Sequence, residues 1–206
     1  MRRAVRAAAA GLAVAAGCVL VGLATGGADG RDGAAGAATG AGDQAGTVRA
    51  AAGAAVVDPA ARQDAPVLSG EDLDGNPVGL AELRGQVVVL NVWGSWCGPC
   101  RAEADDLELL SRQTRADGVR FLGINTRDPD RAAARSFVRA HAVTFPSLHD
   151  PAGELLLRFP PALLNPQAIP STLVIDRRGR IAAGIGGAVT AEQLRPLLAR
   201  LAGEPS

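Results

Sequence analysis

The chain has no lysine, few cysteines and few aromatic residues. All 21 basic residues are arginines, and 21 acids balance them to a net charge of zero. This balance argues against a basic nucleic-acid-binding surface and against a highly charged, unfolded chain. Three cysteines are too few for a small disulfide-stapled scaffold. Aromatic residues make up 3% of the chain and hydrophobic residues 48%, so a core of useful size must be mostly aliphatic.

The N-terminus has the pattern of an export segment. Three arginines within the first six residues precede an Ala-rich apolar stretch over residues 7–24, and small residues follow it. The stretch is at the lower limit of length for a membrane span, and Ala24-Thr25-Gly26 suits a signal peptidase. We therefore expect residues 1–26 to be a signal peptide or a membrane anchor. Either one would place the rest of the chain outside the cytoplasm.

Cys18 and the segment after the leader allow further expectations. Ala15-Ala16-Gly17-Cys18 is similar to a lipoprotein processing box, so lipidation of Cys18 is an alternative to a passive apolar role in the leader. Residues 27–60 are dominated by Gly and Ala and show no period. Such a segment buries too little apolar surface to offset the entropy of ordering. We expect a flexible linker over 27–60 and a folded domain over 61–206.

The first half of the folded domain alternates strand and helix patterns. Val87–Trp93 and Arg120–Asn125 are apolar runs typical of buried strands. Residues 97–116 and Asp130–Ala142 carry apolar residues at helical spacing. Strand–helix–strand–helix predicts a parallel sheet with crossover helices.

The remaining patterns add antiparallel strands. Ser171–Asp176 and Ile181–Gly187 are separated by a turn and predict a hairpin at the far edge of the sheet. Thr190 can cap a final helix, and Asp-Gly turn chemistry within Leu73–Val78 predicts a small hairpin before the central strand. The fold class is therefore α/β: a central mixed sheet flanked by helices on both faces, with an N-terminal hairpin extension.

The chemical centre is Trp96-Cys97-Gly98-Pro99-Cys100, where the central strand ends and a helix begins. Two intervening residues at a helix start let the sulfurs of Cys97 and Cys100 meet. Cys97, at the tip, faces unpaired backbone N–H groups and the positive end of the helix dipole. Both stabilise a thiolate, so Cys97 is the candidate nucleophile and Cys100 the resolving thiol.

Other uses of the two cysteines fit the sequence less well. A structural zinc site needs about four ligands, and only two more distant histidines, His141 and His149, accompany the pair. We expect His141 on an apolar helix face and His149 in a turn. An inert disulfide has no need of a Gly-Pro insert at a helix start. We therefore expect no metal and no cofactor.

Residues 66–200 resemble the thioredoxin-fold TlpA/ResA-like family of exported thiol–disulfide oxidoreductases. Leu83–Glu103 is similar to the central signature of that family, Ile169-Pro170-Ser171-Thr172 to its cis-proline loop, and Leu173–Gly179 to the following strand and turn. The resemblance implies a cis bond at Pro170 beside the sulfurs. It also implies that the Ile169 backbone is open to pair with a substrate, and that Trp96, Gly98 and Pro99 help to form the substrate face.

The chain departs from cytosolic thioredoxins at Asn91, where those proteins carry a buried acid. Asparagine cannot take a proton, so either another acid serves or water carries the proton. Glu103, three residues after Cys100, is the proton-transfer candidate. Its alternative role is that of a surface acid that the helix dipole favours.

The resemblance implies a bacterial, membrane-tethered or secreted enzyme that exchanges disulfides with exported proteins. A TlpA-like reductase would act on substrates such as apocytochromes c and would need a membrane thiol-redox partner for recycling. A disulfide-forming oxidase of the same fold is the main alternative. A peroxiredoxin is less favoured because Gly94 stands where those enzymes carry Thr or Ser, and a copper-handling chaperone because the cysteine spacing is too short.

Overall fold

The computed structural model describes residues 47–49 and 54–205. The predicted leader over 1–26, with Cys18, and the linker up to residue 46 lie outside the described residues. Within the described part of the chain, no helix is long and apolar enough to cross a bilayer.

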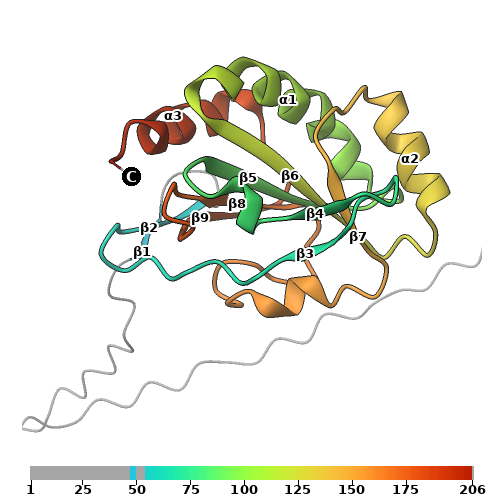
Figure 1. The fold of residues 1–206 in the computed structure, drawn as a ribbon, viewed down its shortest axis with the longest axis horizontal. Helices are drawn as coiled ribbons and strands as arrows, with labels where there is room; N and C mark the ends of the chain where they lie inside the picture. The colour runs from blue at the N-terminus through green and yellow to red at the C-terminus, as the bar shows by residue number, and fades with distance from the viewer. Residues whose placement is uncertain (1–46, 50–53, 206) are drawn as a thin grey trace, which may run out of the picture. The chain divides into compact units, whose positions relative to one another are not determined.

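The described residues form strands, α-helices and short 3-10 helices (Figure 1). The strands are β1 (Thr47–Arg49), β2 (Ala54–Val57), β3 (Ser69–Glu71), β4 (Pro77–Gly79), β5 (Val87–Trp93), β6 (Val119–Thr126), β7 (Ser147–Asp150), β8 (Ser171–Ile175) and β9 (Ile181–Gly186). The helices are α1 (Gly98–Thr114), α2 (Arg131–Ala140) and α3 (Ala191–Ala202), with 3-10 turns η1 (Ala81–Leu83), η2 (Arg115–Asp117) and η3 (Leu155–Arg158).

The central sheet is mixed, as predicted. Its strand order is β1-β2-β9-β8-β5-β6-β7. Strand β5 pairs in parallel with β6 and antiparallel with β8, and β6 pairs in parallel with β7. Strands β8 and β9 form the predicted hairpin. The prediction that this hairpin ends the sheet is wrong, because β2 pairs with β9 and β1 pairs with β2.

The α-helices lie on one face of the sheet, not on both as predicted (Figure 1). The chain steps from β5 to β6 to β7 in a single direction along the sheet. Because crossovers between parallel strands are right-handed, both crossover helices then fall on the same side. Helix α3 packs beside α1 on that side. The segment between β7 and β8, with η3, covers the opposite face.

Alternation along β5 divides the core into two layers. Val88, Leu90 and Val92 face η3 and the segment after it, where Leu156 and Phe159 are buried. The other face of β5 supports α1 and α3, with Val87 and Val89 in the cluster that contains the following buried leucines: Leu107, Leu110, Leu194, Leu198 and Leu201. Strand β5 is buried along its whole length. Packing on both faces therefore fixes the position of its C-terminal end, from which the chain leads to Cys97.

The hairpin before the central strand is present as β3 and β4. The carboxylate of Asp72 accepts hydrogen bonds from the backbone N–H groups of Asp74 and Asn76 at 2.8 Å each. Gly75 has a φ of +88°, a left-handed conformation that side chains rarely adopt. The Asp-Gly turn that the sequence predicts therefore closes this hairpin.

The sheet includes residues that the sequence assigns to the linker. Ala54–Val57 forms β2 and pairs with β9, so the sheet starts before residue 61. The composition of this segment gives little sign of a strand, and only Val56 and Val57 are β-branched. Pairing with an existing sheet edge supplies the order that such a weak strand pattern lacks on its own.

A buried ion cluster joins the start of the domain to its end. The Arg62 guanidinium has no exposed side-chain surface and contacts Asp176 at 3.1 Å and Glu204 at 2.9 Å. Hydrogen bonds to Arg62 hold the pKa of Glu204 below its ordinary value. The backbone N–H of Arg180 and the guanidinium of Arg62 hold the pKa of Asp176 low against the effect of burial.

We expect Arg62→Met to lower the free energy of unfolding at pH 7 by about 2–3 kcal/mol. This is somewhat below the usual ~3–5 kcal/mol for breaking a buried pair, because Asp176 keeps Arg180 and Glu204 is partly exposed. Carboxyls with lowered pKa values stabilise the fold above their unfolded pKa values, and this contribution is lost as the pH falls through the folded values. The difference between variant and wild type, measured by urea unfolding, should therefore shrink at pH 3. Arg195→Met, at an exposed site on α3, is the control, and an equal loss in both variants would contradict this role.

Candidate active site

The two cysteines occupy the start of α1, directly after β5. Cys97 is the N-cap residue, and its sulfur accepts a hydrogen bond from the Cys100 backbone N–H at 3.1 Å. Pro99 lies in the first turn, where its missing N–H leaves no helical hydrogen bond unmade. Cys97 thus takes the place that Ser or Asp usually fills at a helix start, and its sulfur accepts from the helix as their side-chain oxygen would.

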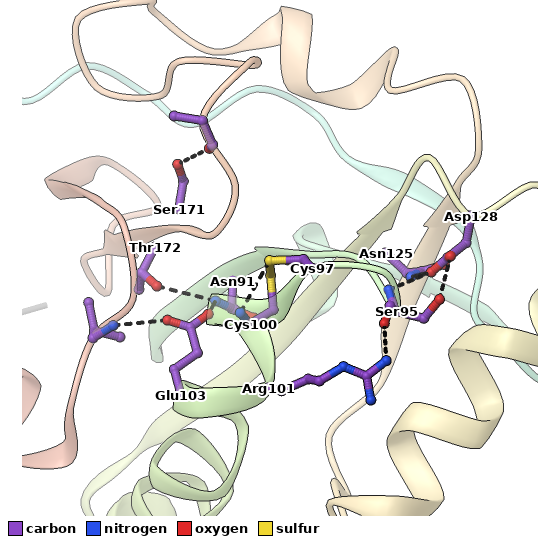
Figure 2. Close-up of a disulfide and its surroundings, with 12 residues drawn as sticks. Asn91, Ser95, Cys97, Cys100, Arg101, Glu103, Asn125, Asp128, Ser171 and Thr172 are labelled. Atoms are coloured by element: carbon purple, nitrogen blue, oxygen red, sulfur yellow. Dashed lines mark hydrogen bonds between the residues drawn. A yellow bond between two sulfur atoms is a disulfide. The ribbon is translucent and has the colours of Figure 1, made fainter. Parts of the chain in front are cut away.

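Cys97 and Cys100 form a disulfide, with their Cα atoms 5.3 Å apart (Figure 2). Cys97 is only 3% exposed and Cys100 is 1% exposed, whereas the sequence leads us to expect Cys97 open at the tip. The pair belongs to an apolar cluster with Trp93, Ala104 and Phe137. Neighbouring side chains thus enclose the two cysteine side chains in this oxidised state, although the first residues of α1 between them are exposed.

The residues expected on the substrate face surround the pair. Trp96 is 52% exposed, and Gly98 and Pro99 are exposed as well. The indole lies over Gly94, where an added Cβ would come within 2.7 Å of the Trp96 Nε1 atom. The position three residues before Cys97 therefore cannot carry a side chain unless Trp96 moves.

The loop before β8 approaches the cysteines from the far end of the sequence. The Ile169–Pro170 peptide bond is cis, as the resemblance implies. Ile169 is partly buried and packs against the cluster that contains both cysteines. The structure therefore brings Ile169 to the cluster that contains Cys97 and Cys100, although about 70 residues separate it from them in sequence.

Glu103 lies inside the protein and is not a surface acid. It is 2% exposed. Its carboxylate accepts hydrogen bonds from the Asn91 side-chain amide at 2.8 Å and from the Val189 backbone N–H at 2.9 Å (Figure 2). Burial raises the pKa of Glu103 from 4.5 to about 7, although both hydrogen bonds act to lower it. An acid with this pKa can both take up and release a proton near neutral pH.

Asn91 connects Glu103 to the sheet. It is buried on β5 and also donates to the Thr172 hydroxyl on β8 at 3.3 Å. Asn91 and Cys100 line the same small cavity. The buried acid that Asn91 cannot supply is therefore supplied from α1, one helical turn beyond Cys100.

A polar network that the sequence analysis missed holds the loop before Cys97. The buried carboxylate of Asp128 binds the Ser95 backbone N–H, the Ser95 hydroxyl and the Asn125 amide. Figure 2 shows these groups beside the disulfide. Asn125 and Asp128 come at the carboxyl end of β6, next to β5, and polar residues at that end of parallel strands are a signal for a site. That signal could have identified them.

The hydrogen-bond partners of the two histidines are residues other than the cysteines. His149 is on β7, so its predicted place in a turn is wrong, and its Nδ1 lies 3.2 Å from the side-chain amide oxygen Oδ1 of Asn125. His141 follows α2 and its Nδ1 lies 2.9 Å from the Asp105 carboxylate. Among the described residues, no group of three or more His, Cys, Asp or Glu side chains is placed to hold a metal ion.

Comparisons with known proteins show the family of the chain. Residues 61–183 match the family model described as "AhpC/TSA family". The thiol–disulfide oxidoreductase ResA of Bacillus thuringiensis is 30% identical over 139 residues, which are 68% of this chain and 77% of that protein. ResA of Bacillus subtilis is 28% identical over 127 residues, 62% of this chain and 68% of that protein.

Solved structures show the same likeness. A secreted thiol–disulfide isomerase from Corynebacterium glutamicum is 33% identical with a TM-score of 0.65, covering 75% of this chain and 94% of that chain. A secreted Mycobacterium tuberculosis disulfide oxidoreductase homologous to DsbE is 29% identical with a TM-score of 0.58, covering 65% of this chain and 96% of that chain. The chain therefore belongs to the AhpC/TSA family, with a thioredoxin-like fold, and is a thiol–disulfide oxidoreductase of the ResA and DsbE type.

Proposed function

We propose that this enzyme is an exported reductase that opens disulfides in other exported proteins, with apocytochromes c as substrates. The observation that carries the proposal is the Cys97–Cys100 disulfide at the N-terminus of α1, with the buried Glu103 one turn further along the helix. The proposed substrate-binding residues are exposed Trp96, Gly98 and Pro99, together with partly buried Ile169 and buried Pro170 from the loop before β8.

The reaction begins with the reduced pair. The Cys97 thiolate attacks one sulfur of the substrate disulfide, and the other substrate sulfur leaves as a thiolate and takes up a proton. Cys100 then loses its proton and attacks Cys97 Sγ in the mixed disulfide, which releases the second substrate thiolate. This second thiolate also takes up a proton, so the substrate gains two electrons and two protons, and the enzyme is left with the disulfide that the structure shows.

Glu103 is the proposed acceptor of the Cys100 proton. Cys100 and Glu103 are three residues apart on α1, a spacing that places side chains as neighbours on a helix. Since the pKa of Glu103 is about 7, its carboxylate is available as a base at neutral pH. Asn91 holds this carboxylate in place through its amide.

The surroundings of the sulfurs favour a reductase over an oxidase. A strongly oxidising pair requires a reduced form that is specially stabilised. Here the sulfurs pack among apolar side chains, and the ionisable group on the next turn is an acid, whose negative charge disfavours a nearby thiolate. A membrane thiol-redox protein is the proposed electron source that reduces the pair again after each turnover.

An apocytochrome c assay tests the direction of the reaction. The reduced enzyme should convert a disulfide between the two haem-binding cysteines of an apocytochrome c to the dithiol, in stoichiometric yield. The oxidised enzyme should leave the apocytochrome dithiol largely unchanged. The opposite pair of results would identify a disulfide-forming oxidase, and rapid consumption of hydrogen peroxide with dithiothreitol would support a peroxidase instead.

Export is a further prediction. Residues 1–60 fused to a reporter that is active only outside the cytoplasm should give activity, because the basic and apolar segments together form an export signal. Changing Arg2, Arg3 and Arg6 to Glu should reduce this activity severalfold, while the same change at Arg31 and Arg49 serves as the control. A full-length protein that stays in the cytoplasm would contradict the proposed compartment.

A further inference from the structure

The loop after β6 contacts both segments that border the disulfide. Arg127, directly after β6, has a φ of +58°, in the left-handed region that non-glycine residues rarely adopt. Its side chain and that of the next residue, Asp128, contact different loops. We propose that Arg127 and Asp128 are positioning residues, which hold the Cys97 loop and the Pro170 loop in the arrangement that thiol–disulfide exchange requires.

Asp128 fixes the Cys97 loop through Ser95. It is 2% exposed. One carboxylate oxygen accepts from the Ser95 N–H at 2.9 Å and from the Asn125 amide at 2.6 Å, and the other accepts from the Ser95 hydroxyl at 2.6 Å. Both oxygens face donors, so an amide here could contact Ser95 on one side only if the Ser95 hydroxyl turned round and accepted from its NH₂ group, and it would lose the charge-assisted character of all three hydrogen bonds.

Ser95 has its remaining polar group bound as well. The Arg101 guanidinium, from the first turns of α1, donates to the Ser95 carbonyl oxygen at 2.7 Å. One residue earlier, the Gly94 carbonyl accepts from the Cys97 N–H at 3.1 Å. The N–H, carbonyl and hydroxyl of Ser95 therefore all have partners. Because Ser95 is two residues before Cys97, Asp128 controls where the helix start and its N-cap sulfur lie.

Arg127 fixes the second loop. Its guanidinium donates to the Pro166 carbonyl at 2.7 Å, and its backbone N–H donates to the Asp150 carbonyl at 3.3 Å. Pro166 belongs to the turn that leads to Pro170, and that turn continues through a hydrogen bond from the Ser171 hydroxyl to the Ala168 carbonyl at 2.7 Å. The Arg127 contact therefore ties the Pro170 loop to the end of β6.

The left-handed backbone at Arg127 makes the double contact possible. Successive residues of an extended strand point to opposite faces of the sheet, but a left-handed residue turns the chain at once. This conformation has an energetic cost, and such residues persist where the surrounding contacts determine them, commonly at functional sites. Here the contacts of Arg127 and Asp128 reach the Pro170 loop and the Cys97 loop. Neither Arg127 nor Asp128 needs to touch the substrate.

Asp128→Asn tests the first contact. We expect kcat/KM for insulin reduction with dithiothreitol to fall roughly ten- to a hundredfold, since a displacement of about 1 Å costs up to about a hundredfold. The pH midpoint for iodoacetamide alkylation of reduced Cys97, a readout that needs no substrate, should rise. Loss of a buried negative charge alone would lower that midpoint, so the direction separates loop positioning from simple electrostatics.

Matched variants complete the Asp128 experiment. Asp130→Asn is the control in the same loop, because the Asp130 side chain caps α2 and asparagine caps equally well; it should behave as wild type. If Asp128→Asn does not fold, Ser95→Ala removes one of the hydrogen bonds and should shift both readouts in the same direction by less. A folded variant at position 128 or 95 with wild-type kcat/KM and an unchanged or lowered alkylation midpoint overturns the proposal.

Arg127→Asn tests the second contact. Asparagine tolerates the left-handed backbone but is too short to reach the Pro166 carbonyl. We expect KM for insulin to rise severalfold, with little change in the alkylation midpoint or in the rate with oxidised glutathione. Arg158→Asn, which removes a comparable guanidinium-to-carbonyl contact to Val67, is the control. Equal losses with insulin and glutathione, or no loss with insulin, would remove Arg127 from this role. The alkylation midpoints stay informative even if the enzyme proves to be an oxidase.

Discussion

Cys97→Ser is expected to abolish the reduction of protein disulfides. The serine hydroxyl can still cap α1, so the fold should persist, but no thiolate remains at the helix start to attack a substrate. Insulin reduction with dithiothreitol should fall to the uncatalysed rate. The experiment is best done with Cys18→Ser in every protein, so that the cysteine outside the described residues cannot react.

Cys100→Ser should have a different phenotype at the same site. Attack by Cys97 remains, but the second cysteine no longer resolves the mixed disulfide. Covalent complexes with substrate proteins should therefore accumulate and be visible on non-reducing gels. Treatment of the sample with excess dithiothreitol should remove them. If iodoacetamide at mildly acidic pH modifies Cys100 in the Cys97→Ser protein faster than Cys97 in the Cys100→Ser protein, the assignment of the nucleophile is reversed.

Glu103→Gln is expected to slow thiol–disulfide exchange. It should also remove the loss of stability that wild type shows as the pH rises. Without a base for the Cys100 proton, resolution should slow by about a hundredfold, the lower end of typical general acid–base contributions. Wild-type mixed disulfides are transient, so their accumulation in this variant would identify the affected step. Glu82→Gln, at an exposed site on η1, is the control.

The sign of the stability effect follows from the pKa of Glu103. The folded value of about 7 lies above the ordinary value of 4.5, so the folded protein binds the proton more tightly. Wild-type stability therefore falls as the pH rises from 4.5 to 7. A difference of this size corresponds to about 3 kcal/mol. Urea unfolding of the oxidised proteins measures this effect. The free energy of unfolding of the Gln variant, relative to that of wild type, should rise by about 3 kcal/mol between pH 4 and pH 8. A difference between the two proteins that does not change with pH would contradict the raised pKa.

The sequence predicts the fold well where its patterns are local. The apolar run over Val87–Trp93 coincides with β5, and Thr190 forms a capping box with Gln193 at the start of α3. Errors arise where tertiary pairing decides. The β2 strand depends on the edge that β9 offers, and the placement of the α-helices on one face depends on strand order, which no local pattern contains.

The site residues also divide into those that a local pattern predicts and those that depend on tertiary contacts. Cys97 and Cys100 are predictable because spacing and position at a helix start define them. The burial of Glu103 is not, because a charge on a helix is usually solvated, and only the distant partners Asn91 and Val189 show otherwise. The contact of Asp128 with Ser95 depends on two neighbouring strands ending together.

A redox titration of the Cys97–Cys100 pair tests the central claim most directly. The full-length protein would be equilibrated in dithiothreitol and glutathione buffers, and its free thiols would then be alkylated and counted by mass spectrometry. We predict a single two-electron transition of these two cysteines, closer to the thioredoxin potential of about −270 mV than to the DsbA potential of about −120 mV. A pair that stays oxidised throughout, or one that titrates near the DsbA potential, would contradict the proposed reductase.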